Sequence, residues 1–129
     1  MRILVVSSVG GHLAEAVKAL NPNSGDEIVL VVNDNCCVPE FPFARVYRIR
    51  HAERDWKVLL NVLECARIIR SELPDVVFST GAGPAVPMCV VARGLGGAGI
   101  VFLESAAAIS KPTLTGRIMY QIADRFFFQ

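Results

Sequence analysis

The sequence is poor in charge and in the residues that usually hold metal ions. Charged residues make up 19% of its 129 residues and the formal net charge is +1, which gives no electrostatic reason to expect nucleic acid. The only histidines are His12 and His51, and the four cysteines form no CxxC pair, so we expect no metal site. We expect the cysteines to be reduced thiols, as in a cytoplasmic protein.

Long apolar runs and a secretion signal are missing as well. No run approaches the about 20 apolar residues of a membrane-spanning helix, and the chain begins directly with a strand-like run, so we expect no signal peptide. Apolar residues nevertheless make up 53% of the chain, which suggests a large partner interface or a membrane-facing patch. The length indicates a single domain, 1–129, that buries roughly two-thirds of its unfolded surface.

Strand-like and helix-like segments alternate along the chain. Short apolar or alternating runs predict six strands, at 2–7, 27–32, 44–49, 75–79, 100–103 and 125–128. Apolar residues at helical spacing predict helices at 12–20, 55–72, 84–95 and 114–123, with Asp55 and Thr113 as N-caps. Residues 33–43 contain Pro39 and Pro42 and are expected to be irregular. This alternation predicts a three-layer, doubly wound parallel α/β sheet of the Rossmann type, with strand order 3-2-1-4-5-6.

Polar segments follow three of the predicted strands, at 7–12, 79–83 and 104–105. In an open α/β sheet, ligands bind along the carboxyl edge, so we expect the site there, with the first two segments flanking the switch point. Gly10 and Gly11 let the backbone approach a ligand and leave helix N–H groups for an anion or a sugar hydroxyl, although a simple tight turn is an equal alternative. The GxGxxG spacing of a dinucleotide site is absent, and Asp34 is more simply part of a turn than a ribose-binding acid.

Three further groups at this edge could take part in chemistry. Thr80, Gly81 and Gly83 form a second glycine-rich turn, suited either to an anion or hydroxyl, or to close packing of helix on sheet. Glu104 ends an apolar strand before Ser105 and could accept a proton, or it could cap a helix. His12 could act as a base or orient a hydroxyl, or it could bond locally at the start of its helix.

The helix around 56–70 combines apolar and basic residues. Trp56 and Leu60 lie near Lys57, Arg67 and Arg70. Such a helix could lie on a membrane surface. The alternative is a core helix whose basic face is solvated.

Two stretches of the chain resemble a known family. They are 6–15 (VSSVGGHLAE) and 79–129, where TGAGPAVPMCVVAR and the following ES are the most specific. They resemble the membrane-associated subunit of two-part GT-B glycosyltransferases, namely the ALG-fourteen-type subunit of eukaryotes and the bacterial PssD and CpsF type proteins. The chain is more distantly similar to the N-terminal half of MurG, whose GGTGGH loop and HEQN segment parallel Gly10-Gly11-His12 and Glu104. The resemblance is weak over 34–54.

The resemblance implies the N-terminal, acceptor-side half of a GT-B fold. It implies a hexosyltransferase subunit, active only with a partner that carries the UDP-sugar site, and peripheral on the cytoplasmic face of the membrane. The acceptor would be a lipid-diphosphate-linked sugar, and N-acetylglucosamine the sugar transferred. We expect Glu104 or His12 to be catalytic, and no cofactor.

The residues expected to bind the acceptor are those of the two turns and their neighbour, Gly10, Gly11, Thr80, Gly81, Gly83 and Ser105. Two other functions stay open. One is a non-catalytic scaffold that recruits and activates a partner transferase. The other is a self-contained nucleotide-binding oxidoreductase, against which the missing third glycine argues.

Overall fold

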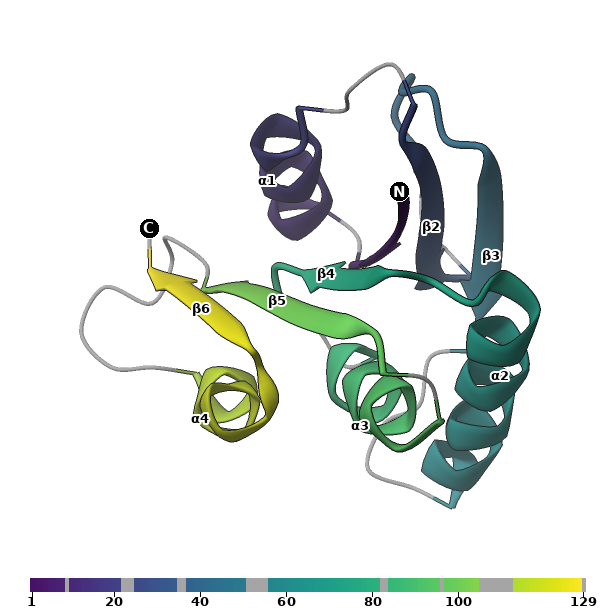
Figure 1. The fold of residues 1–129 in the computed structure, drawn as a ribbon, viewed down its shortest axis with the longest axis vertical. Helices are drawn as coiled ribbons and strands as arrows, with labels where there is room; N and C mark the ends of the chain where they lie inside the picture. The colour runs from purple at the N-terminus through teal and green to yellow at the C-terminus, as the bar shows by residue number, and fades with distance from the viewer. Residues whose placement is uncertain are drawn as a thin grey trace.

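The computed structural model describes residues 1–8, 10–21, 25–34, 37–50, 56–81, 84–95, 97–104 and 113–128. They form one parallel sheet of six strands in the order β3-β2-β1-β4-β5-β6, as predicted (Figure 1). The strands are β1 (Arg2–Val6), β2 (Glu27–Asn33), β3 (Arg45–Ile49), β4 (Val76–Ser79), β5 (Gly99–Glu104) and β6 (Arg125–Phe128). The order reverses between β1 and β4, where Val6 pairs with Ser79 at the carboxyl ends.

Helices cover both faces of the sheet. They are α1 (Gly11–Ala19), α2 (Lys57–Glu72), α3 (Ala85–Leu95) and α4 (Leu114–Ile122). In Figure 1, α1 lies on one face, and α2, α3 and α4 lie on the other. Strand side chains alternate between two buried clusters, since Val5 and Leu30 pack with α1 whereas Leu4 and Phe102 pack with the other three helices. The predicted three-layer arrangement is therefore confirmed.

The α1 layer is completed by an irregular segment between β2 and β3. Its described part, residues 37–44, contains no helix or strand, as predicted from the prolines. Val38, Phe41 and Phe43 pack against the cluster that contains Leu13. This irregular segment thus covers part of the α1 face of the sheet.

The ends of the predicted elements are close to the observed ones. Every predicted strand lies within one residue of its observed bounds, and β5 includes Glu104 as its last residue. Thr113 is the N-cap of α4, as predicted, and its Oγ1 accepts from the N–H of Gly116 at 2.9 Å. The predicted N-cap Asp55 lies outside the described residues. Cys65 and Cys89 are buried, and burial raises the pKa of each thiol to about 12.

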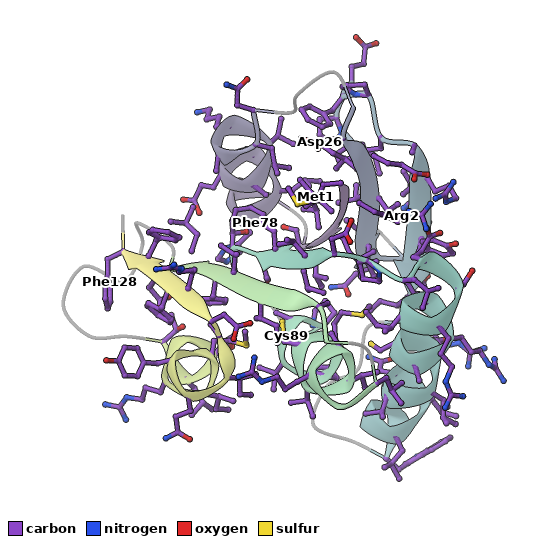
Figure 2. All side chains as sticks on the ribbon, viewed as in Figure 1. Met1, Arg2, Asp26, Phe78, Cys89 and Phe128 are labelled. Atoms are coloured by element: carbon purple, nitrogen blue, oxygen red, sulfur yellow. The ribbon has the colours of Figure 1, made fainter. Side chains whose placement is uncertain are left out.

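A network of charges closes the amino edge of the sheet, opposite the expected site. Arg45 donates to Glu72 at 2.7 and 2.8 Å and to Glu27 at 2.5 Å, and Arg2 donates to Glu27 at 2.8 Å. Tyr47 donates its hydroxyl to Glu72 at 2.5 Å. Figure 2 shows Arg2 on the β2 and β3 side of the molecule, far from Phe128. These contacts tie three strands to the end of α2.

Within the part of the chain that the structure describes, no helix is both long and apolar enough to cross a bilayer.

Candidate functional site

The two glycine turns meet at the switch point, as their positions after β1 and β4 predict. Ser79, fully buried at the end of β4, donates its hydroxyl to the carbonyl oxygen of Val6 at 2.9 Å. The N–H of Gly81 in turn donates to Ser79 Oγ at 3.2 Å. Ser79 therefore fixes the second turn to the end of the first strand. The role of Ser79 could not be predicted, because the sequence does not show which carbonyl a serine at the end of a strand will meet.

His12 and Thr80 join the turns a second time. His12 Nδ1 lies 3.1 Å from the carbonyl oxygen of Thr80, and Thr80 Oγ1 donates to the carbonyl oxygen of His12 at 2.8 Å. A carbonyl only accepts, so the first contact places a proton on Nδ1 and leaves Nε2 as the basic nitrogen of the neutral ring. Gly81 sits beside this ring with φ +107°, which favours glycine.

The start of α1 presents uncapped backbone donors. Gly10 occupies the N-cap position with φ 90°, and no side chain caps the helix there. The first turn carries no acidic residue, and Gly10 and Gly11 are exposed. The predicted first turn can therefore offer N–H groups to an anion or a hydroxyl.

Glu104 lies on the other layer. It is 4% exposed, and its Oε1 accepts from the hydroxyl of Thr113, the N-cap of α4, at 3.1 Å. Its Oε2 is buried and has no hydrogen-bond partner among the described residues. A Cβ on Gly116 would overlap this oxygen, so Gly116 leaves the space that the carboxylate fills. Because α1 and α4 cover opposite faces of the sheet (Figure 1), His12 and Glu104 stand on opposite layers. Their catalytic roles stay predictions.

Two predicted acceptor contacts, Gly83 and Ser105, lie outside the described residues. Thr80 and Gly81 are buried, whereas Gly10 and Gly11 are open to solvent. The first turn is thus the more accessible of the two. No group of His, Cys, Asp and Glu that could hold a metal occurs among the described residues.

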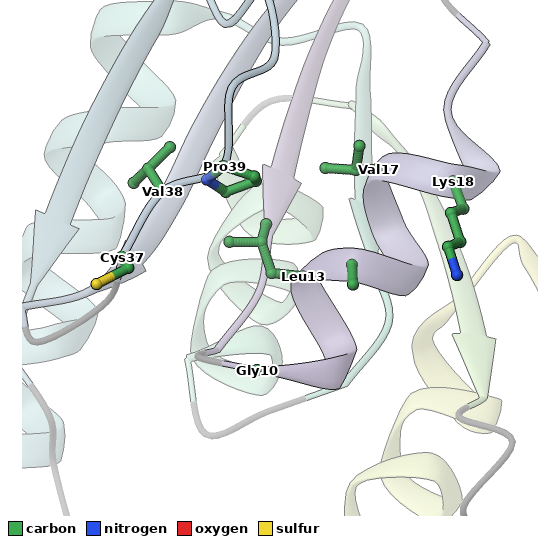
Figure 3. Close-up of a pocket in the computed structure, with 8 residues that line it drawn as sticks. Gly10, Leu13, Val17, Lys18, Cys37, Val38 and Pro39 are labelled. Atoms are coloured by element: carbon green, nitrogen blue, oxygen red, sulfur yellow. The ribbon is translucent and has the colours of Figure 1, made fainter.

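A groove that the sequence did not reveal begins at Gly10 (Figure 3). It measures about 580 Å³ and separates α1 from the segment that follows β2. Its lining is mostly apolar and consists of Gly10, Leu13, Ala14, Val17, Lys18, Cys37, Val38 and Pro39. The groove therefore lies between a helix and an irregular segment.

The outer face of α2 carries a stripe of two kinds of residue. Trp56, Leu59 and Leu63 are 68%, 69% and 56% exposed, and Arg67 and Arg70 are exposed further along. Their spacing of three or four residues places all five on one line along the helix. The inner face packs into the core through Cys65, Ile68 and Ile69. Because α2 follows β3, the apolar half of this stripe lies toward the carboxyl edge, where the glycine turns are.

Comparisons with solved structures agree with the fold. The structure is similar to MurG from Acinetobacter baumannii, with a TM-score of 0.74 and 18% identity, over 98% of this chain and 40% of the MurG chain. It is also similar to an S. aureus MnaA–UDP structure, with a TM-score of 0.70 and 16% identity over 98% of this chain and 38% of that one. The chain therefore has the fold of one part of these longer proteins, spanning about two-fifths of their length.

Comparisons with known sequences identify a family. A rat protein named UDP-N-acetylglucosamine transferase subunit ALG14 is 26% identical over 160 residues, which cover 98% of this chain and 74% of the rat protein. A Clostridium botulinum protein named as a pyrophosphoryl-undecaprenol N-acetylglucosamine transferase is 31% identical over 82 residues, covering 60% of this chain and 22% of that protein. Residues 32–129 match the family described as "Oligosaccharide biosynthesis protein Alg14 like". Since that match covers most of the chain, the protein belongs to the Alg14-like family.

Proposed function

We propose that this chain is the acceptor-side subunit of a two-part glycosyltransferase that transfers N-acetylglucosamine from a UDP-sugar to a lipid-diphosphate-linked sugar. The family match and the names of the rat and clostridial relatives support the sugar and the reaction class. The observation that carries the acceptor site is the pair of glycine turns held together at the switch point by Ser79, His12 and Thr80.

The nucleotide-sugar site belongs to a separate partner subunit in this proposal. The chain has no GxGxxG fingerprint, and its fold corresponds to about two-fifths of the MurG chain. The partner would present its UDP-sugar across the carboxyl edge of the sheet. The chain's part would be to hold the acceptor and to supply a base.

The chemistry assigned to this edge is a displacement with inversion at the anomeric carbon. The acceptor hydroxyl oxygen forms the new glycosidic bond, the bond from the anomeric carbon to UDP breaks, and UDP leaves with the electron pair. The hydroxyl proton passes to a base, for which Glu104 is the first candidate and His12 Nε2 the second. The exposed amides at Gly10 and Gly11 would hold phosphate oxygens of the acceptor.

Docking on the cytoplasmic face of a membrane is the second part of the proposal. Trp56, Leu59 and Leu63 would enter the interface, while Arg67 and Arg70 would meet anionic headgroups. The apolar half of the stripe lies toward the edge that carries the glycine turns, so docking through it would bring a membrane-held acceptor closer to them.

A scaffold without chemistry is the second candidate function. Two observations favour it: Glu104 is buried against α4, and one nitrogen of His12 is engaged by Thr80. Such a subunit would bind and activate its transferase partner through the same fold.

The test is reconstitution with a partner that carries a UDP-sugar site. The chain alone should transfer no sugar and should bind UDP-N-acetylglucosamine weakly or not at all by calorimetry, whereas the mixture should transfer sugar to a lipid-diphosphate acceptor. Micromolar affinity for the UDP-sugar without a partner would overturn the proposal that the partner subunit carries the UDP-sugar site.

A further inference from the structure

A second groove, separate from the one at Gly10, lies between α4 and the edge strand β6. It measures about 580 Å³, within the range of small-molecule sites. Three aromatic rings and three other residues line it: Gly116, Arg117, Tyr120, Gln121, Phe126 and Phe128. Figure 2 shows Phe128 at the outer end of the sheet. Nothing in the proposed role of the glycine turns uses this groove.

The aromatic wall of the groove is anchored in the core but open to solvent. Phe126 packs on the buried Phe102 with ring centroids 5.2 Å apart. It also contacts Tyr120 edge-on at 5.4 Å and Phe128 at 5.0 Å. Tyr120 and Phe128 are nevertheless 68% and 70% exposed. Rings that are held in place and left open suit a ligand with a flat apolar face.

The inner end of the groove adjoins a buried carboxylate oxygen. Gly116 lines the groove, and the space where its side chain would be is filled by Glu104 Oε2. This oxygen is buried and has no hydrogen-bond partner among the described residues. A buried acceptor of this kind is costly unless a donor reaches it. The groove therefore combines apolar ring faces with an adjacent acceptor that needs a donor.

We propose that this groove binds a pyranose ring, namely the sugar of the acceptor. A pyranose offers apolar C–H faces to Tyr120 and Phe128 and hydroxyl donors at its rim. Arg117 and Gln121 supply further hydrogen-bonding groups, and a hydroxyl entering beside Gly116 would donate to Glu104 Oε2, which has no donor among the described residues. A lipid chain would satisfy the rings but not the carboxylate.

The position of the groove fits an acceptor whose phosphates lie at the glycine turns. Those turns follow β1 and β4, and β5 and β6 are the next two strands. β6 is three strands from β1 and two strands from β4, so the groove lies roughly 14 Å along the edge from the first turn and roughly 10 Å from the second. The identity of this sugar as the acceptor rests on the proposed function; the binding of a pyranose does not.

Titration of the isotope-labelled chain with the methyl glycoside of N-acetylglucosamine tests the proposal without a partner or a lipid. We expect saturable amide shifts at Gly116, Arg117, Tyr120 and Gln121, and none with sorbitol, an open-chain polyol without a ring face. Phe128→Ala should weaken the glycoside about tenfold, because it removes one stacking surface.

The matched control is Phe127→Ala. Phe127 is the neighbouring residue, 52% exposed, and points to the opposite face of β6, so its loss should leave the affinity unchanged. The proposal would be overturned if the two variants weakened glycoside binding equally, or if sorbitol caused the same amide shifts as the glycoside. Amide shifts confined to the turns at Gly10 and Gly81 would also overturn it. The proposal would also be overturned if the glycoside did not bind and Phe128→Ala abolished binding of the partner, because the groove would then be a protein interface. Glycoside binding without sugar transfer in the reconstituted pair would overturn the proposed function and leave this site standing.

Discussion

His12 and Thr80 bind each other twice across the gap between β1 and β4. The imidazole Nδ1 lies 3.1 Å from the carbonyl oxygen of Thr80, and the threonine hydroxyl donates to the carbonyl oxygen of His12 at 2.8 Å. The two contacts set both the distance between the glycine turns and the tautomer of the imidazole, whose Nε2 stays basic. Removing the Thr80 hydroxyl should therefore disturb both glycine turns, although the substitution itself is small.

Replacing Thr80 by valine keeps the shape of the side chain and removes its hydroxyl. Thr80 is fully buried, and the His12 carbonyl would lose a donor that valine cannot replace. We expect a loss of about 1–2 kcal/mol in the free energy of unfolding and weaker binding of the lipid-diphosphate acceptor in the reconstituted pair. Urea unfolding and the KM for the acceptor measure the two effects. Thr115→Val makes the same chemical change on α4, and an equal effect on KM there would contradict the role of Thr80 at the site.

Glu104 and His12 should respond differently to substitution if the carboxylate is the base. Glu104→Gln keeps the contact with Thr113 but removes a proton acceptor, so turnover in the reconstituted pair should fall about 10²- to 10⁴-fold while the complex still forms. His12→Ala should mainly raise the KM for the acceptor, because it loosens the turns. A fall in kcat at His12 with normal turnover at Glu104 would make His12 the base. Near-normal turnover in both variants would favour the scaffold.

The strand order could be predicted from the sequence, whereas the setting of Glu104 could not. Six short apolar runs alternate with segments whose apolar residues have helical spacing, and this pattern is compatible with few sheet topologies. The right-handed crossover rule for parallel strands selects one of them. The environment of Glu104 depends on Thr113 and Gly116, which are nine and twelve positions further along and meet it only through the packing of α4 on β5. A residue that ends a strand at the carboxyl edge can turn toward either layer, and the sequence does not show which.

The two sides of α2 illustrate the same limit. Apolar residues occur all around this helix, so periodicity predicts a helix but not which stripe packs inward. In the structure, the row through Cys65 and Ile69 enters the core, and the row through Trp56 and Leu63 stays outside. The buried row and the exposed Arg67 and Arg70 agree with the alternative of a core helix with a solvated basic face, whereas the membrane-surface alternative stays a prediction. The exposed apolar half of the outer row was visible only in three dimensions.

Acid should destabilise the protein through the amino edge of the sheet. Hydrogen bonds from Arg2 and then Arg45 hold the pKa of Glu27 below the ordinary 4.5, and a hydrogen bond from Arg45 does the same for Glu72. The stability that these carboxylates contribute is therefore complete above pH 4.5 and is lost as the pH falls through their lowered values. We expect the urea midpoint to drop steadily below that pH.

Arg45→Met removes the largest cause of the shift at Glu72 while keeping the length of the side chain. The variant should be less stable at pH 7 and should lose less stability than the wild type on acidification. Arg125→Met is the matched control, because it makes the same substitution at an exposed arginine on β6, at the far side of the sheet, and should leave the acid profile unchanged. If stability falls equally with pH in the wild type and in Arg45→Met, the acid sensitivity does not come from this network.

Docking through α2 can be followed with the only tryptophan of the chain, since Trp56 leads the exposed stripe. With vesicles that contain anionic lipid, Trp56 emission should shift to shorter wavelength as the ring leaves water, and the protein should pellet with the vesicles. High salt should release it, because the contribution of Arg67 and Arg70 is screened. Neutral vesicles should bind it more weakly.

Paired substitutions separate this stripe from the rest of the surface. Arg67→Glu with Arg70→Glu reverses two charges on the stripe and should abolish pelleting, with each exposed arginine worth about 1 kcal/mol near an anionic surface. Arg117→Glu with Arg125→Glu makes the same change in net charge on α4 and β6, where both side chains are exposed, and should leave pelleting intact. Equal losses in the two double variants would mean that net charge, and not the α2 stripe, brings the protein to the membrane. An unshifted Trp56 spectrum in a pelleting protein would place the docking face elsewhere on the molecule.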